Sequence, residues 1–173
     1  IVILGLSITS SWGNGHATTY RALLKGLVAG GHDVVFLERD VPWYAENRDL
    51  RRLEGVTVEL YASLASLKRR FRNTIGQADA VIVGSYVPQG IELGRWILRT
   101  ANGVVAFYDI DTPVTLAALA RGSCEYLEVE MIRQYPLYLS FTGGPMLRQL
   151  ELEFGSPCAR ALYCGVDPSR HRP

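Results

Sequence analysis

Short apolar runs and amphipathic stretches alternate along the chain. Most runs have strand length and are apolar at nearly every position, which is typical of strands covered on both faces. These runs lie at residues 1–6, 33–38, 56–60, 79–85, 103–111, 137–143 and 159–165. The stretches between them repeat apolar residues with helical spacing. They lie at residues 16–29, 63–76, 88–101, 112–122, 127–134 and 145–154, and a short helix is expected within 41–54.

This alternation predicts an α/β fold. Parallel pairing with right-handed crossovers gives a doubly wound, mostly parallel, Rossmann-like sheet of about six to seven strands with helices on both faces. The run at 56–60 alternates apolar and polar residues, which indicates a strand near an edge. Ligands of such sheets bind beyond the carboxyl ends of the strands. That rule selects the loops at 8–16, 39–44, 85–89, 109–112 and 142–146.

Composition narrows the class of protein. The 173 residues are 48% hydrophobic and 20% charged, which fits a globular domain, and the net charge of +1 favours no nucleic-acid partner. No apolar run approaches the roughly 20 residues of a transmembrane segment, and no signal peptide is visible. Cys124, Cys158 and Cys164 form no C-x-x-C pair, which favours reduced thiols. We therefore expect a cytoplasmic protein.

The turn at Gly13, Asn14 and Gly15 leads from the first strand into the first helix. Free amide groups at a helix start favour an anion or a sugar oxygen, although any parallel sheet also needs tight turns here. His16, at the helix start, is a candidate general base, a substrate contact or a capping residue. Both interpretations of the turn remain open at this stage.

A dinucleotide-binding site is an alternative for the same turn. The G-x-G-x-x-G fingerprint requires a third glycine at position 18, but Thr18 stands there, which weakens this interpretation. Glu38 closes the second strand at the place of a ribose-binding acid.

Asp109 and Asp111 end a predicted parallel strand. A D-x-D pair can hold a divalent ion, but in this position capping of the next helix, a substrate hydroxyl contact or a base role is favoured, and we expect no metal site. Thr112 is expected to cap that helix through its hydroxyl, with Pro113 in the first turn.

Two further strand ends carry polar or glycine-rich turns. Ser85 and Tyr86 follow the fourth run, and Thr142, Gly143 and Gly144 follow the sixth. Backbone amides and hydroxyls at these places can hold a ligand group, or they can simply form tight turns.

Four segments together resemble a known family. The segment "ILGLSITSSWGNGHATTYRALLKGLVAGGHDVVFLERD" resembles the opening of GT-B-fold glycosyltransferases. The tail "ALYCGVDPSRHRP" resembles the segment that closes the amino-terminal domain of many retaining members, with His171 in place of the usual aromatic residue. The segments "FYDIDTP" and "LSFTGGP" are similar to those of a bacterial subgroup related to the spore-protein glycosyltransferase-like proteins.

The resemblance implies a domain organisation. Residues 1–165 would form a Rossmann-like acceptor-side domain, and residues 166–173 would begin the linker to a carboxyl-terminal donor-binding domain beyond this chain. The whole enzyme would move a sugar from a nucleotide-sugar donor to an unknown glycan, lipid or small-molecule acceptor, without an obligatory metal or cofactor. The fragment alone would be inactive.

The resemblance also implies roles for the candidate residues. The candidate catalytic residues are His16, Asp109 and Asp111. The candidates for binding the substrate or the donor phosphates are Gly13, Asn14, Gly15, Thr18, Ser85, Tyr86, Thr142, Gly143 and Gly144. Two alternatives remain: a nucleotide- or dinucleotide-binding enzyme domain of the epimerase or dehydrogenase kind, and a non-catalytic module that binds sugar or protein.

Overall fold

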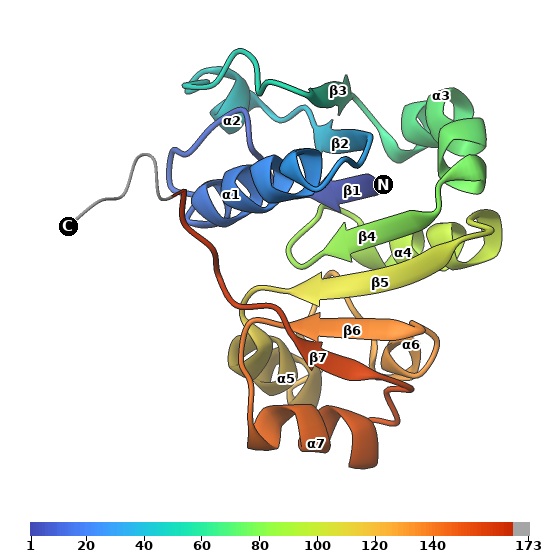
Figure 1. The fold of residues 1–173 in the computed structure, drawn as a ribbon. Coiled ribbons are helices and arrows are strands. Elements are labelled where there is room, and N and C mark those ends of the chain that lie inside the picture. Colours follow the sequence, from blue (N-terminus) through green and yellow to red (C-terminus); the bar gives the residue numbers. More distant parts are fainter. Residues whose placement is uncertain (168–173) are drawn as a thin grey trace.

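All seven strands of the described chain run parallel in one sheet, in the order β3-β2-β1-β4-β5-β6-β7 (Figure 1). The computed structural model describes residues 1–167. The strands are β1 (Val2–Gly5), β2 (Val34–Arg39), β3 (Val56–Tyr61), β4 (Ala80–Gly84), β5 (Val104–Asp109), β6 (Leu137–Ser140) and β7 (Ala159–Ala161). This confirms the predicted doubly wound α/β fold, and β3 lies at an edge as its alternating pattern indicates.

The helices occupy the predicted amphipathic stretches. They are α1 (His16–Ala29), α2 (Pro42–Ala45), α3 (Leu64–Gln77), α4 (Gly90–Thr100), α5 (Thr112–Ala120), α6 (Val129–Ile132) and α7 (Pro145–Leu152). Ser63 caps α3 through a reciprocal pair of hydrogen bonds with Ser66. Together with the strands, these helices confirm every element that the hydrophobic pattern predicts.

Several strands are shorter than their apolar runs. The apolar run at 159–165 predicts a strand to residue 165, but β7 ends at Ala161. Beyond it the chain leaves the sheet and runs back to α1, where Lys25 hydrogen-bonds Asp167. Leu162 packs against the apolar cluster that contains Tyr20 and Leu24, whereas Tyr163 and Val166 are 67% and 59% exposed. The remainder of the expected linker, residues 168–173 with His171, lies outside the described residues.

Two apolar clusters lie on opposite faces of the sheet. One contains Tyr20 and Leu24 of α1 with Ile3 and Phe36 of the sheet. The other contains inward residues of α3, α4, α5, α6 and α7. The change of face follows from the strand order, because right-handed crossovers lead from β1 toward β2 but from β4 toward β5 in the opposite direction. The loops after β1 and β4 therefore separate and leave a crevice at the carboxyl edge.

Candidate functional site

A cavity of about 640 Å³ lies at this crevice, and we call it the switch-point pocket. Its walls come from the segments that follow five strands, β1, β4, β5, β6 and β7, and from the start of α1. Segments far apart in the sequence thus meet at one edge of the sheet, as the rule for parallel sheets predicts. The lining residues are Leu6, Gly13, Asn14, Gly15, His16, Thr19, Tyr86, Ile110, Asp111, Phe141 and Cys164.

Asn14 organises the first turn of the pocket. Its side-chain amide donates to the carbonyl oxygens of Ser7 (3.0 Å) and Ser10 (3.2 Å), and its Oδ1 accepts from the His16 amide (3.0 Å). Its carbonyl oxygen accepts from the amide of Ala17 (3.4 Å). The expected set of free amides at the start of α1 is therefore partly used by the turn itself. Asn14 is a buried organiser of the loop that also lines the cavity.

Glu38 holds the segment that precedes this turn. Its carboxylate is fully buried and accepts four hydrogen bonds, from the hydroxyls of Ser7 (2.9 Å) and Thr9 (2.5 Å) and from the amides of Ile8 (2.7 Å) and Thr9 (3.0 Å). Both carboxylate oxygens are occupied by the protein. Glu38 therefore orders the loop after β1, and in this structure it does not present an oxygen to a ribose.

His16 and Asp111 face each other across the pocket. His16 Nε2 lies 3.7 Å from Asp111 Oδ2, which is too long for a direct hydrogen bond, and the side chains are 13% and 41% exposed. Burial lowers the pKa of His16, and Asp111 opposes this only in part. At neutral pH the imidazole is therefore uncharged and able to accept a proton. Its Nδ1 atom is buried with no hydrogen-bond partner among residues 1–167.

His16 occupies the first position of α1 but does not cap it. The residue before it, Gly15, holds the N-cap position, and the first helical amide, that of His16, donates to the side chain of Asn14. Asp111 likewise holds the N-cap position of α5, yet its side chain makes no capping hydrogen bond. Both side chains point instead to the same cavity, which favours a functional interpretation of the pair.

Tyr86 forms a wall of the pocket beside His16. The two rings meet edge to face with their centroids 5.2 Å apart, and Tyr86 also packs against Tyr126, with centroids 4.6 Å apart. Its φ angle of +64° is in the left-handed region that non-glycine residues rarely adopt. Such strained residues cluster at functional sites and persist only where the surrounding structure fixes them.

Asp109 lies beneath the pocket rather than in its lining. It is fully buried and accepts hydrogen bonds from Tyr138 Oη (2.6 Å), Thr115 Oγ1 (2.7 Å) and the Asp111 amide (3.1 Å). Burial raises the pKa of Asp109, and the hydrogen bonds from Tyr138 and Thr115 act in the opposite direction. Asp109 thus fixes the backbone that carries Asp111. Because one acid is buried and the other lines the cavity, the two do not face a shared metal position.

Two other polar residues proposed at strand ends have structural partners. Ser85 is fully buried, and its hydroxyl accepts from the Ile110 amide at 3.2 Å, which ties the loop after β4 to the loop after β5. The expectation that the Thr112 hydroxyl caps α5 is wrong. Thr112 is itself helical, and its Oγ1 lies 2.7 Å from Ser140 Oγ of β6.

The remaining candidates lie outside the lining of the switch-point pocket. Thr18 is exposed and borders a separate cavity beside α1, whereas Thr19, one turn after His16, lines the pocket. Thr142, Gly143 and Gly144 follow β6, but Phe141 is the residue of that loop in the lining. The spacing of three residues from His16 was the one signal available for Thr19. No sequence signal distinguished Phe141 or Cys164.

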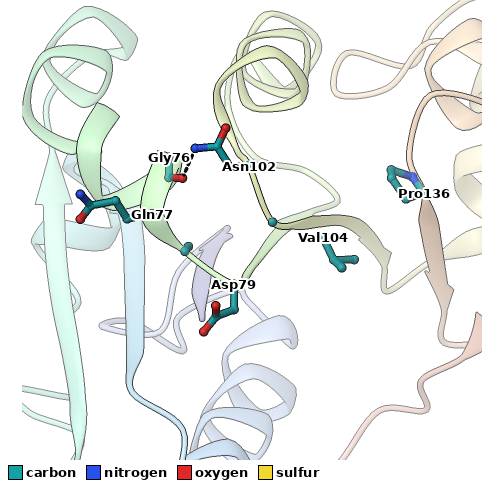
Figure 2. A pocket seen from close by; sticks show the side chains of 8 residues that line it. Gly76, Gln77, Asp79, Asn102, Val104 and Pro136 are labelled. Atoms are coloured by element: carbon teal, nitrogen blue, oxygen red, sulfur yellow. Dashed lines mark hydrogen bonds between the residues drawn. The ribbon is translucent and has the colours of Figure 1, made fainter.

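A cavity of comparable size, about 570 Å³, opens at the opposite edge of the sheet, and we call it the amino-edge pocket. Figure 2 shows Gln77 and Asp79 on one side of it and Val104 and Pro136 on the other. The Asn102 side chain donates to the carbonyl oxygen of Gly76 at 2.7 Å and thereby ties the ends of α3 and α4 together. This cavity lies at the amino ends of the strands, away from His16 and Asp111.

Comparison with known proteins adds no family assignment. No protein-family model matches the chain, and no curated protein matches its sequence. Within residues 1–167, no group of three or more histidine, cysteine, aspartate or glutamate side chains is placed to hold a metal ion. No helix in that part of the chain has both the length and the apolar character needed to span a bilayer.

Proposed function

We propose that this domain is the acceptor-side half of a glycosyltransferase that uses a nucleotide sugar. The observation that carries the proposal is the pair of His16 and Asp111 at the switch-point pocket, with Nε2 and Oδ2 3.7 Å apart. A neutral imidazole beside a carboxylate is suited to take a proton from an alcohol. The resemblance of the first turn to GT-B-fold enzymes supports the same assignment.

The chemistry follows from the positions of the two side chains. An acceptor hydroxyl in the pocket donates its proton to His16 Nε2, and its oxygen forms a bond to the anomeric carbon of the donor sugar. The bond from that carbon to the phosphate oxygen breaks, and the nucleotide diphosphate leaves with the electron pair. Asp111 stabilises the positive charge that develops on the imidazole. The donor is held by a second domain, which the resemblance implies.

Stereochemistry is one consequence of this mechanism. Direct attack by a hydroxyl that a base has activated inverts the configuration at the anomeric carbon. The tail that resembles retaining enzymes suggests the other outcome, but it lies partly outside the described residues. Nuclear magnetic resonance of the first product formed distinguishes the two.

Binding of a dinucleotide is less well supported. Thr18 replaces the third glycine of the fingerprint, and Glu38 directs both carboxylate oxygens to its own chain. A non-catalytic binding module would use the same cavity but would have no need of a neutral histidine beside a carboxylate.

The test is sugar transfer and nucleotide-sugar hydrolysis by the full-length protein. We expect His16→Ala to lower the rate about 10²-fold or more, as loss of a general base does. His32→Ala is the matched control, because His32 is exposed in the turn after α1. Asp111→Asn is paired with Asp79→Asn at the amino-edge pocket. Equal rates for His16→Ala and His32→Ala in an active enzyme would remove His16 from the mechanism.

A further inference from the structure

A second cavity, of about 360 Å³, adjoins the switch-point pocket on the far side of Tyr86, and we call it the side pocket. Tyr86 belongs to the lining of both cavities. Its ring centroid lies 5.2 Å from that of His16, which lines the switch-point pocket, and 4.6 Å from that of Tyr126, which lines the side pocket. A molecule that extends past Tyr86 would therefore place one end near His16 and the other in the side pocket.

The lining of the side pocket is chiefly apolar and aromatic. Pro88, Val114, Ala118 and the rings of Tyr86 and Tyr126 supply this surface, and Gln89 and Ser123 are uncharged polar residues of the lining. Glu125 is the single charged residue among the described residues that line it, and no cationic side chain faces a ligand there. An anionic group would therefore lack a cationic partner, whereas an uncharged ring would bury its faces against tyrosine and proline.

The backbone around the side pocket is held in an unusual conformation. Tyr86 and Gln89 have φ angles of +64° and +58°, and they flank the lining residues Val87 and Pro88. Gly90 follows, and a Cβ atom there would meet Tyr126 at 2.7 Å, so glycine is required for this close approach. The strained turn is thus fixed against Tyr126, as is typical of ligand-binding segments.

The orientation of Tyr126 is also fixed from below. Its hydroxyl lies 2.9 Å from Thr115 Oγ1, which donates to Asp109 at 2.7 Å. The hydroxyl is therefore engaged by the protein, and the ring offers its apolar surface to the cavity. The buried carboxylate of Asp109, which accepts a hydrogen bond from the Asp111 amide, thus also positions Tyr126 in the wall of the side pocket through Thr115.

We propose that the side pocket binds the aromatic body of an uncharged acceptor alcohol whose hydroxyl reaches His16. This inference rests on the proposed function for the role of His16, but the binding itself does not. A volume of about 360 Å³ is near the lower end of the range of roughly 300–1,000 Å³ for small-molecule sites. It therefore suits one or two fused rings better than a long alkyl chain.

The test is binding of 2-naphthol to the full-length protein, measured by calorimetry, with 1-octanol and glucose as comparison probes. Ala118→Phe fills the side pocket from α5, and its matched control is Ala117→Phe, at an exposed neighbouring position on the same helix. We expect Ala118→Phe to weaken 2-naphthol binding at least about tenfold, and Ala117→Phe to change it less than about twofold. Where Ala118→Phe does not fold, Val114→Asp, at a lining position 54% exposed, repeats the test.

Equal dissociation constants of 2-naphthol for Ala118→Phe and Ala117→Phe would overturn the inference. Tighter binding of 1-octanol or glucose than of 2-naphthol would also overturn it. His16→Ala separates it from the proposed function, because this variant should lose transfer and still bind 2-naphthol. If wild type binds 2-naphthol in an Ala118-dependent manner but transfers no sugar, the side pocket stands and the proposed function fails. If transfer depends on His16 while Ala118→Phe has no effect on 2-naphthol binding, the proposed function stands and the inference about the side pocket fails.

Discussion

The two edges of the sheet hold cavities of similar volume but different chemical content. The switch-point pocket measures about 640 Å³ and the amino-edge pocket about 570 Å³. At the carboxyl edge, His16 and Asp111 face a cavity without bonding to each other directly. At the amino edge, Asn102 is hydrogen-bonded to Gly76, and short turns join the helix ends to β4 and β5 (Figure 2). Volume alone therefore does not identify the site.

Gly13 and Gly15, which line the switch-point pocket, differ from Gly103, which lines the amino-edge pocket. At the carboxyl edge, a Cβ atom on Gly13 or Gly15 would have nothing within 4 Å, so the space beside these residues is open. At the amino edge, a Cβ atom on Gly103 would lie 2.3 Å from the carbonyl oxygens of Ala78 and Asp79. Gly13 and Gly15 thus border open space, and the φ of +57° at Gly13 favours glycine there, whereas Gly103 is packed closely against backbone, as Gly90 is packed against Tyr126 at the carboxyl edge. The following substitutions test this difference.

Loss of the Glu38 carboxylate should have the largest effect. Glu38→Ala leaves the amides of Ile8 and Thr9 and two hydroxyls buried without an acceptor, which should lower the free energy of unfolding by about 3 kcal/mol or more. Urea denaturation measures the change. Glu46→Ala, at an exposed position nearby, should stay within about 0.5 kcal/mol of wild type. Similar losses for both variants would contradict the assignment of Glu38 as the organiser of the loop.

Substitution of glycine at the amino edge should have an intermediate effect. Gly103→Ala forces a Cβ atom against two backbone carbonyls and should lower the free energy of unfolding by about 1–3 kcal/mol. Gly76→Ala is the matched control in the same pocket, because its Cβ atom would lie 3.5 Å from the Thr100 carbonyl oxygen. In a helix this change should be neutral or stabilise by about 0.5 kcal/mol. Thermal unfolding of the pair tests the distinction, and an unaffected Gly103→Ala would refute it.

The pH dependence of stability should show the smallest effect. Burial lowers the pKa of His16 in the folded state, so the unfolded state binds a proton at a higher pH than the folded state does. The contribution of neutral His16 to the free energy of unfolding is therefore fully present above the ordinary histidine pKa. It is lost as the pH falls from that value toward the lowered pKa of the folded state. Urea unfolding over a pH series should show this slope in wild type and His32→Gln, but not in His16→Gln. A slope that survives in His16→Gln would assign it to another group.

The proposed mechanism predicts a related dependence for transfer. Because the reaction requires the neutral imidazole, the rate should fall at acid pH, with a midpoint below the ordinary histidine pKa. Asp111→Asn should shift this midpoint further down, because Asp111 is the group that raises the pKa of His16. A midpoint that does not respond to Asp111→Asn would show that another group titrates.

Much of the architecture follows from the sequence by itself. The order of apolar runs and amphipathic stretches determines the parallel sheet, since short connections with right-handed crossovers leave few alternatives. That topology also brings the loops at 8–16, 85–89 and 109–112 to one edge, where the structure places the switch-point pocket. The sequence indicates His16 as a candidate because it stands at the start of the first helix, and Asp109 and Asp111 because they end a parallel strand.

The tertiary structure decided which neighbouring residue faces the cavity. Asp109 and Asp111 are two positions apart, and a small turn of the chain buries one among Tyr138 and Thr115 and leaves the other beside His16. Which side chain is buried and which faces the cavity depends on contacts between residues distant in sequence, such as the contact of Tyr86 with Tyr126. The local sequence pattern determines which helices and strands form. Whether a polar side chain is hydrogen-bonded within the protein or faces the cavity depends on partners that only the folded chain brings within hydrogen-bonding distance.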